Sequence, residues 1–128
     1  MHQIKIGSDG GKTCHVLIQG LVSENFSAEP ILFFKDIVGT SNTRAPVTKM
    51  RLDGVQFAIQ EKMGFDLWWM MEGDNLELIL PLESRGGFDF EKIISIHSPE
   101  GARGLAFSCF KVSEPEMSFM LMLDFTKQ

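Results

Sequence analysis

The sequence contains no tyrosine, only two cysteines and no long apolar run. No stretch approaches the roughly eighteen consecutive apolar residues that a membrane-spanning helix needs, so we expect no membrane partner. The N-terminal MHQIKIG lacks an apolar segment of signal-peptide length, which predicts a protein made in a cytoplasm without a secretion signal. Cys14 and Cys109 lie in apolar, strand-like runs, and we expect two free buried thiols.

The balance of charge is acidic. The net charge of −5 argues against nucleic acid or an anionic membrane as a partner bound through a general basic face. Residues 1–63 carry seven basic and six acidic side chains, whereas residues 64–128 carry five and eleven. A chain of 128 residues can bury an adequate core without a disulfide or a metal, and we expect a single domain over residues 1–128.

Apolar and polar residues alternate with a period of two through most of the chain, which is typical of β-strands. Turn-forming residues between alternating runs predict hairpins over residues 3–22 and 65–82. Asp53 and Gly54 interrupt a further long strand and predict a β-bulge there. Three more strands are expected over residues 88–97, 104–112 and 116–126. The first of these also suits a helix, and the last two could pair with each other.

Residues 27–38 depart from this pattern. Ser27 suits a helix N-cap, Pro30 suits the first turn and Gly39 follows the end, so the segment predicts a short helix. A strand is the alternative, because Ile-Leu-Phe-Phe also suits a sheet. The sequence therefore predicts an all-β fold, or a mainly β fold with one short helix, arranged as an antiparallel β-sandwich or a small barrel.

The hairpin over residues 65–82 is unusual because both of its faces have apolar centres. One face carries the side chains expected in the core: Phe65, Leu67, Trp69, Met71, Leu76, Leu78, Leu80 and Leu82. An antiparallel sheet with a solvated face normally carries polar residues there. The second face and the final strand instead carry a group of apolar side chains, which consists of Trp68, Met70, Ile79, Met120 and Met122. We expect this group to be covered by the protein's own helix or loop, by another subunit or by a small apolar ligand.

The segment IGSDGGKT ends like a phosphate-binding loop. Ile6, however, stands where that motif requires its first glycine. The run that follows alternates as a strand and does not open a helix. We therefore interpret the segment as a hairpin turn.

No side chains have the spacing of a catalytic or metal site. His2, His15 and His97 are far apart, and His97 lies in a Pro- and Gly-containing segment that is typical of a turn. Cys109 has apolar neighbours and no adjacent base. The carboxylates of the 65–82 hairpin are expected to keep a sheet rim soluble. We therefore expect no catalytic residue, no metal, no cofactor and no enzymatic activity.

One local grouping is basic. Lys35, Arg44, Lys49 and Arg51 predict either a docking patch for an acidic partner or an ordinary solvated face. Arg85 lies between two flexible stretches and could bond carbonyl groups or a carboxylate. We keep Arg44, Lys49, Arg51 and Arg85 as possible docking residues.

Residues 67–93 and the closing FMLMLDFTKQ resemble small structural proteins encoded among the virion genes of tailed bacteriophages. The resemblance rests on the Leu-Trp-Trp hairpin, on PLESRGG over residues 81–87, on Phe-Asp-Phe over residues 88–90 and on a last strand with an acidic end. It implies a virion component, such as a capsid decoration (cement) subunit or a part of the tail or its adaptor. Its partners would be copies of itself, capsid proteins or tail proteins. A small-molecule-binding β-barrel lined by Phe and Met is the alternative that the composition leaves open.

Overall fold

The computed structural model describes residues 2–9, 13–36, 47, 49–60, 62–83, 85–89, 96–113 and 116–127, and for 2–9, 85, 88 and 89 it describes the backbone. In these residues the regular structure is β-strand, apart from two single turns of 3₁₀ helix. The elements are β1 (His2–Asp9), β2 (Thr13–Val22), β3 (Phe26–Phe33), η1 (Phe34–Asp36), β4 (Met50–Ile59), β5 (Gly64–Met71), η2 (Glu72–Asp74), β6 (Leu76–Glu83), β7 (Arg85–Asp89), β8 (Ile96–His97), β9 (Ala102–Phe110) and β10 (Met117–Lys127).

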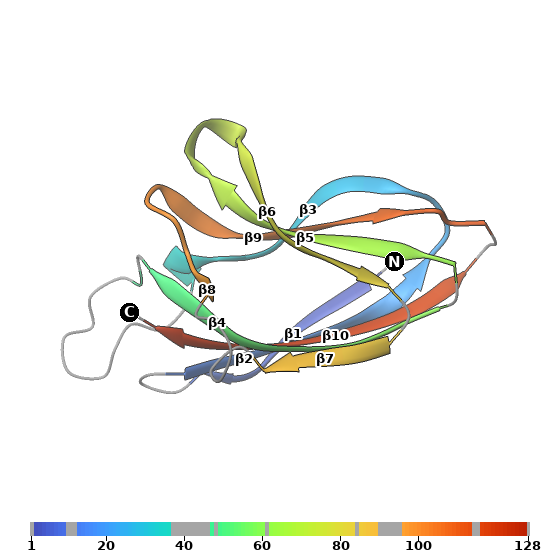
Figure 1. The fold of residues 1–128 in the computed structure, drawn as a ribbon, viewed down its shortest axis with the longest axis horizontal. Helices are drawn as coiled ribbons and strands as arrows, with labels where there is room; N and C mark the ends of the chain where they lie inside the picture. The colour runs from blue at the N-terminus through green and yellow to red at the C-terminus, as the bar shows by residue number, and fades with distance from the viewer. Residues whose placement is uncertain are drawn as a thin grey trace.

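The strands form two antiparallel sheets that lie face to face (Figure 1). Sheet A has the order β1-β2-β10-β4-β7, and β8 also pairs with β4. Sheet B has the order β3-β9-β5-β6. In the part of the chain that the structure describes, the two sheets stay separate, so the fold is an antiparallel β-sandwich.

The core lies between the two sheets and is rich in phenylalanine. Phe65 on β5 and Phe107 on β9 project from sheet B, and Phe119 on β10 projects from sheet A. The ring centroids of Phe65 and Phe119 are 4.7 Å apart, and those of Phe107 and Phe119 are 5.9 Å apart. Alternate residues of the strands supply this layer, because successive side chains of a strand point to opposite faces. Cys14 and Cys109 are both buried thiols in this layer, as expected.

The expected helix at residues 27–38 is wrong over its first half. Residues 27–33 belong to strand β3, and only Phe34–Asp36 make a single 3₁₀ turn. β3 is an edge strand of sheet B, where Pro30 is tolerated because its missing N–H costs least at a sheet edge. Ile31 and Leu32 are buried, so packing of these β-favouring side chains outweighs the capping signal. Residues 37 and 38 lie outside the described residues.

Of the other expectations from the sequence, some are confirmed and one is wrong. β1 and β2 pair as the predicted hairpin, and the bulge predicted near Gly54 is present, because the β4–β10 register shifts between Asp124 and Phe125. The expected pairing of residues 104–112 with 116–126 is wrong. β9 lies between β3 and β5 in sheet B, whereas β10 lies between β2 and β4 in sheet A. In residues 88–97, only the end of β7 and the short β8 are described, and 90–95 lie outside the described residues. No helix in the described part of the chain has the length and apolarity to cross a membrane.

Candidate functional site

The β5–β6 hairpin changes register halfway along its length. Leu67 pairs with Leu80, but the next residue, Trp68, pairs with Leu78, so Ile79 is an extra residue on β6. A one-residue shift moves every later side chain of a strand to the opposite face of the sheet. Leu76 and Leu78 therefore leave the core face and join Trp68 on the outer face of sheet B.

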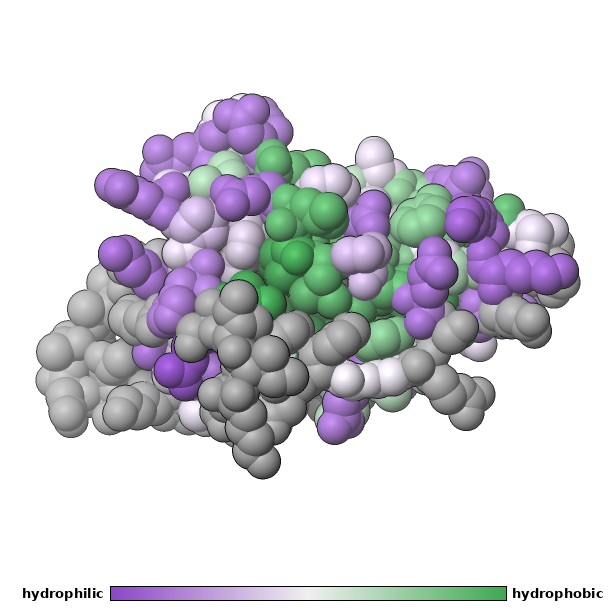
Figure 2. Space-filling model, viewed as in Figure 1, coloured by the Kyte–Doolittle hydropathy of each residue, from purple (hydrophilic) through white to green (hydrophobic). Residues whose placement is uncertain are grey.

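These outward leucines are the most exposed large apolar side chains of the hairpin. Leu76 is 43% exposed and Leu78 is 50% exposed. We call Trp68, Leu76 and Leu78 the β6 ridge. Figure 2 shows hydrophobic side chains gathered over β6 on the face in view, with hydrophilic groups around them. The exposed acidic residues nearest along the hairpin are Glu72, Asp74, Glu77 and Glu83, and β6 is the last strand of sheet B.

A shallow hollow of about 380 Å³ adjoins the ridge on the outer face of sheet B. Its lining includes Trp68, Leu76, Asp66, Ser108 and Phe110. The Trp68 indole N–H donates to the Ser108 hydroxyl oxygen at 2.9 Å, which fixes the orientation of the ring. Partial burial raises the pKa of the Asp66 carboxyl above its ordinary value.

The five residues predicted to form one interface do not lie on one surface. Trp68 and Met70 belong to β5 in sheet B, whereas Met120 and Met122 belong to β10 in sheet A. Met70 is only 6% exposed, because its methyl group lies over Gly104 of the neighbouring strand. Ile79, at the bulge, is half-buried and packs against the core. Alternation gave the right outward faces along β5 and β10, but it could not show that these two strands belong to different sheets.

The outer face of sheet A carries polar groups beside its exposed apolar side chains, one of which is Leu21 at 44% exposed. Met122, which is 42% exposed, lies between Leu17 and Gln56 on the neighbouring strands. The His15 Nδ1 and Asp124 Oδ1 atoms of the same face are 2.5 Å apart. Its methionines are therefore accompanied by polar groups that already have partners.

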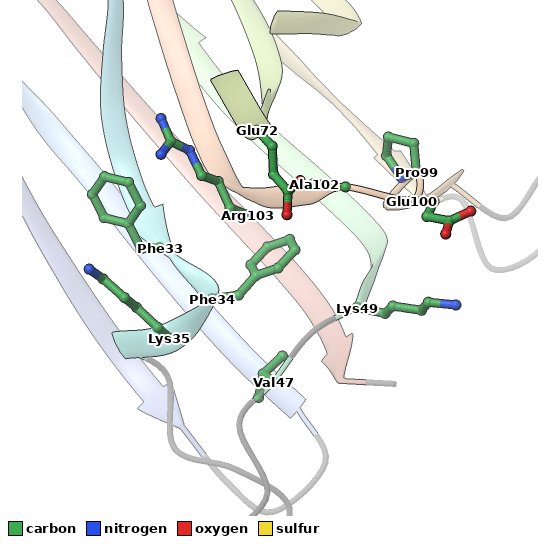
Figure 3. Close-up of a pocket in the computed structure, with 11 residues that line it drawn as sticks. Phe33, Phe34, Lys35, Val47, Lys49, Glu72, Pro99, Glu100, Ala102 and Arg103 are labelled. Atoms are coloured by element: carbon green, nitrogen blue, oxygen red, sulfur yellow. The ribbon is translucent and has the colours of Figure 1, made fainter. Parts of the chain in front are cut away.

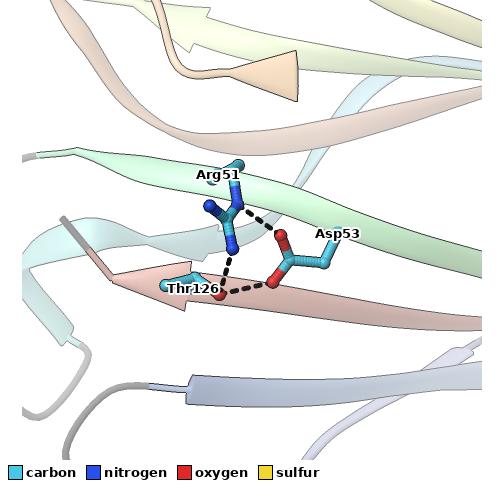
Figure 4. Close-up of polar contacts among 3 residues, drawn as sticks. All are labelled: Arg51, Asp53 and Thr126. Atoms are coloured by element: carbon cyan, nitrogen blue, oxygen red, sulfur yellow. Dashed lines mark hydrogen bonds and ion pairs between the residues drawn. The ribbon is translucent and has the colours of Figure 1, made fainter. Parts of the chain in front are cut away.

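Arg51, one of the predicted docking residues, is also on sheet A and belongs to a polar cluster (Figure 4). Its Nε donates to Asp53 Oδ1 at 2.6 Å, and its Nη2 donates to the Thr126 hydroxyl oxygen at 3.2 Å. The Thr126 hydroxyl in turn donates to the other carboxylate oxygen of Asp53. These bonds hold the guanidinium flat against the sheet.

Of the other predicted docking residues, Lys49 has a described side chain. Arg44 lies outside the described residues, and so does the side chain of Arg85. Lys49 lines a cavity of about 570 Å³ at one end of the sandwich (Figure 3). Lys35 and Arg103 line the same cavity. Lys35 and Lys49, which the sequence grouped, therefore line the same cavity but at different ends of it (Figure 3). Arg103 lies at the Lys35 end, is distant in sequence and gave no signal.

Three further side chains carry groups of a kind that takes part in catalysis, namely those of Cys109, Ser98 and His97. Burial raises the pKa of the Cys109 thiol to about 11, so the thiol is protonated at neutral pH. Ser98 is buried and structural, because its hydroxyl oxygen accepts the Met50 backbone N–H at 2.9 Å. His97 lies on the short strand β8 and is exposed. No group of three or more His, Cys, Asp or Glu side chains within the described ranges is arranged to hold a metal ion.

Comparisons with known proteins leave the family open. No protein-family model matches the sequence. No curated protein matches it either. Among solved structures, a cupin superfamily protein from Desulfitobacterium hafniense is similar over 99% of this chain and 77% of that chain, with a TM-score of 0.36 and 10% identity.

Two further solved structures show the same level of similarity. A cupin-2 domain containing protein from Shewanella frigidimarina covers 94% of this chain and 78% of its own, with a TM-score of 0.30 and 11% identity. Drosophila melanogaster CENP-C bound to CAL1 covers 92% and 79%, with a TM-score of 0.31 and 10% identity. Similarity at this level establishes neither family nor function.

Proposed function

We propose that this protein is a non-enzymatic assembly subunit that associates with a second copy of itself through the β6 ridge. The observation that carries the proposal is the exposure of Leu76 and Leu78, at 43% and 50%, on the edge strand of a sheet. Large apolar side chains grouped inside a charged rim are typical of protein–protein contacts. Beyond β5, β6 pairs with no other described strand, and an unpaired strand edge is also a surface that other chains bind.

The β6 ridge of one subunit is suited to contact the same ridge of a second subunit. In a two-fold contact the same patch from both subunits meets itself, so residues nearest the axis contact their own counterparts. Leu78 lies between Leu76 and the cross-strand Trp68, at the centre of the ridge. The axis therefore passes closest to Leu78. The adjoining hollow of about 380 Å³ beside Trp68 gives the partner's leucines a place to pack.

The charged rim gives this contact a distinct salt dependence. Glu83 is exposed and lies on the same outer face of sheet B as the ridge, so a two-fold contact brings carboxylates of like charge toward its edge. Salt screens such repulsion over about 8–10 Å at ordinary ionic strength. Self-association should therefore strengthen as salt is added, whereas binding to a basic partner would weaken.

The biological setting that we propose is the virion of a tailed bacteriophage. It is supported by the sequence resemblance over residues 67–93 and 119–128, which includes the strand that carries the ridge. A decoration subunit on the capsid is the leading role, and a tail or adaptor component is the alternative. Both roles need repeated contacts between small subunits.

Sedimentation velocity over a range of protein concentrations tests the contact. We expect a concentration-dependent dimer that Leu78→Ser weakens about tenfold or more, because the variant replaces a half-exposed leucine with a polar group. Met122→Ser is the matched control, since it changes a similarly exposed apolar side chain on the opposite face. A chain that stays monomeric at every concentration and salt, or a dimer lost only in Met122→Ser, overturns the proposal.

A further inference from the structure

The cavity at the end of the sandwich has a lining that is both apolar and charged. It measures about 570 Å³, within the size range of small-molecule sites. Phe34 and Val47, both buried, form its apolar floor together with the half-buried Phe33. Phe34 is held in place by Trp69 in the core, since their ring centroids are 6.2 Å apart at 73°. The floor is therefore a fixed part of the fold.

Positive charge gathers at one end of this cavity. Figure 3 shows Arg103 and Lys35 near Phe33, with Pro99 and Glu100 at the opposite end and Glu72 between them. Lys35 Nζ lies 5.5 Å from the centroid of the Phe33 ring. Phe33 pairs with Gly104, the residue next to Arg103, so all three side chains belong to one corner of the sandwich.

The cations at this end remain available to a ligand. Lys35 forms no ion pair with a described residue, and Lys49 lies toward the other end, on the side of Glu100 (Figure 3). Arg103 Nη2 is 3.2 Å from Asp74 Oδ1, but the Asp74 side chain is almost fully exposed, and an ion pair of this kind is weak. The other guanidinium N–H groups of Arg103 form no hydrogen bond with a described residue.

We propose that this cavity binds a small organic carboxylate. The carboxylate group would lie between Lys35 and Arg103, and the apolar body would lie over Phe34 and Val47. Glu72 and Glu100 line the remaining wall and repel a negative charge there, so they set the direction in which the ligand enters. Arg favours carboxylates because its N–H groups match the two carboxylate oxygens. This site goes beyond the assembly role and does not depend on it.

The probe is 3-phenylpropionate, compared with its uncharged amide and with inorganic phosphate. Isothermal titration calorimetry or NMR shift titration of the full chain should show binding of the carboxylate that weakens with added salt. The amide should bind about tenfold more weakly, because it keeps the apolar body but loses the charge. Phosphate should bind weakly, because it has no apolar body to cover the cavity floor.

Variants locate the site. Lys35→Gln and Arg103→Gln should each weaken carboxylate binding about threefold to tenfold. Lys111→Gln is the matched control, because Lys111 is also an exposed cation but does not line the cavity. Leu78→Ser should leave carboxylate binding unchanged, which separates this proposal from the assembly contact. Circular dichroism confirms that each variant is folded.

The carboxylate of the ligand can belong either to a free organic acid or to the C-terminus of a polypeptide. Titration with the peptide Gly-Gly-Phe beside 3-phenylpropionate separates them, and tighter binding of either one identifies the source. Three results overturn the proposal: no saturable binding of either probe at millimolar concentration, equal affinity for acid and amide, or affinity that is unchanged in both Lys35→Gln and Arg103→Gln.

Discussion

Leu78 on β6 lies directly across from Trp68 on β5, one residue out of step with the first half of the same hairpin. The extra residue, Ile79, turns two leucines of the strand away from the core and onto the outer face of sheet B. Without this bulge the strand would carry its leucines on the core side. The local shift in register therefore creates the apolar surface on which the proposed contact depends.

Gly104 marks the closest approach of two strands in sheet B. A Cβ atom at this position would lie 2.3 Å from the Leu32 carbonyl oxygen and 2.7 Å from the Met70 methyl carbon. Gly104→Ala should therefore lower the free energy of unfolding by about 2 kcal/mol or more, since a backbone carbonyl cannot easily move aside. Denaturant unfolding measures the change. An unchanged midpoint would mean that β3 does not approach β9 this closely.

Asp66 should make stability depend on pH. Burial raises the pKa of its carboxyl above the ordinary value of 3.8, so the folded state holds the proton more tightly than the unfolded chain. The stabilising effect of this protonation is complete below pH 3.8 and is lost as the pH rises through the folded pKa. Asp66→Asn should then raise the melting temperature at pH 7 by about 1–2 °C, and the gain should vanish in acid.

Asp53→Asn is the control for that measurement. Its carboxylate accepts hydrogen bonds from Arg51 and Thr126, so the substitution should lower stability at pH 7 by about 1 kcal/mol. The two aspartates thus predict changes of opposite sign. Equal losses in both variants would contradict the assignment of Asp66 as a carboxyl that is destabilised by burial.

The two cysteines should be unreactive in the folded protein. Both thiols are buried, and burial raises the pKa of Cys109 to about 11, so almost no thiolate forms at pH 8. A disulfide reagent such as DTNB should titrate neither thiol in native buffer and both in denaturant. Rapid reaction of one thiol in the native state would show that the interface between the sheets opens around it.

The sequence was sufficient for the fold class but not for the pairing of strands. Alternation identified most strands, and Gly54 signalled its bulge. No glycine or other bulge-forming residue marks the register shift at Ile79 in the sequence. Leu76 and Leu80 therefore look equivalent in an alternating run. Sheet membership was hidden as well, since strands with similar patterns, such as β9 and β10, belong to different layers.

The residues of the candidate site could likewise be predicted from the sequence only in part. Trp68 was found because it breaks the expected polarity of an outward face. Leu76 and Leu78 were assigned to the core, because only the three-dimensional pairing reveals the shift. Arg103 was missed because its neighbour in the cavity, Lys35, is far away along the chain and comes close to it only when β3 and β9 pair.

Cross-linking at position 78 tests the proposed contact most directly. Leu78→Cys places a thiol next to the predicted two-fold axis, where the same residue of the second copy lies within the reach of a disulfide. Under mild oxidation we predict a covalent dimer that excess wild-type chain suppresses, whereas Met122→Cys should cross-link far more slowly. Efficient cross-linking of Met122→Cys together with a monomeric Leu78→Cys would contradict the account and move the contact to sheet A.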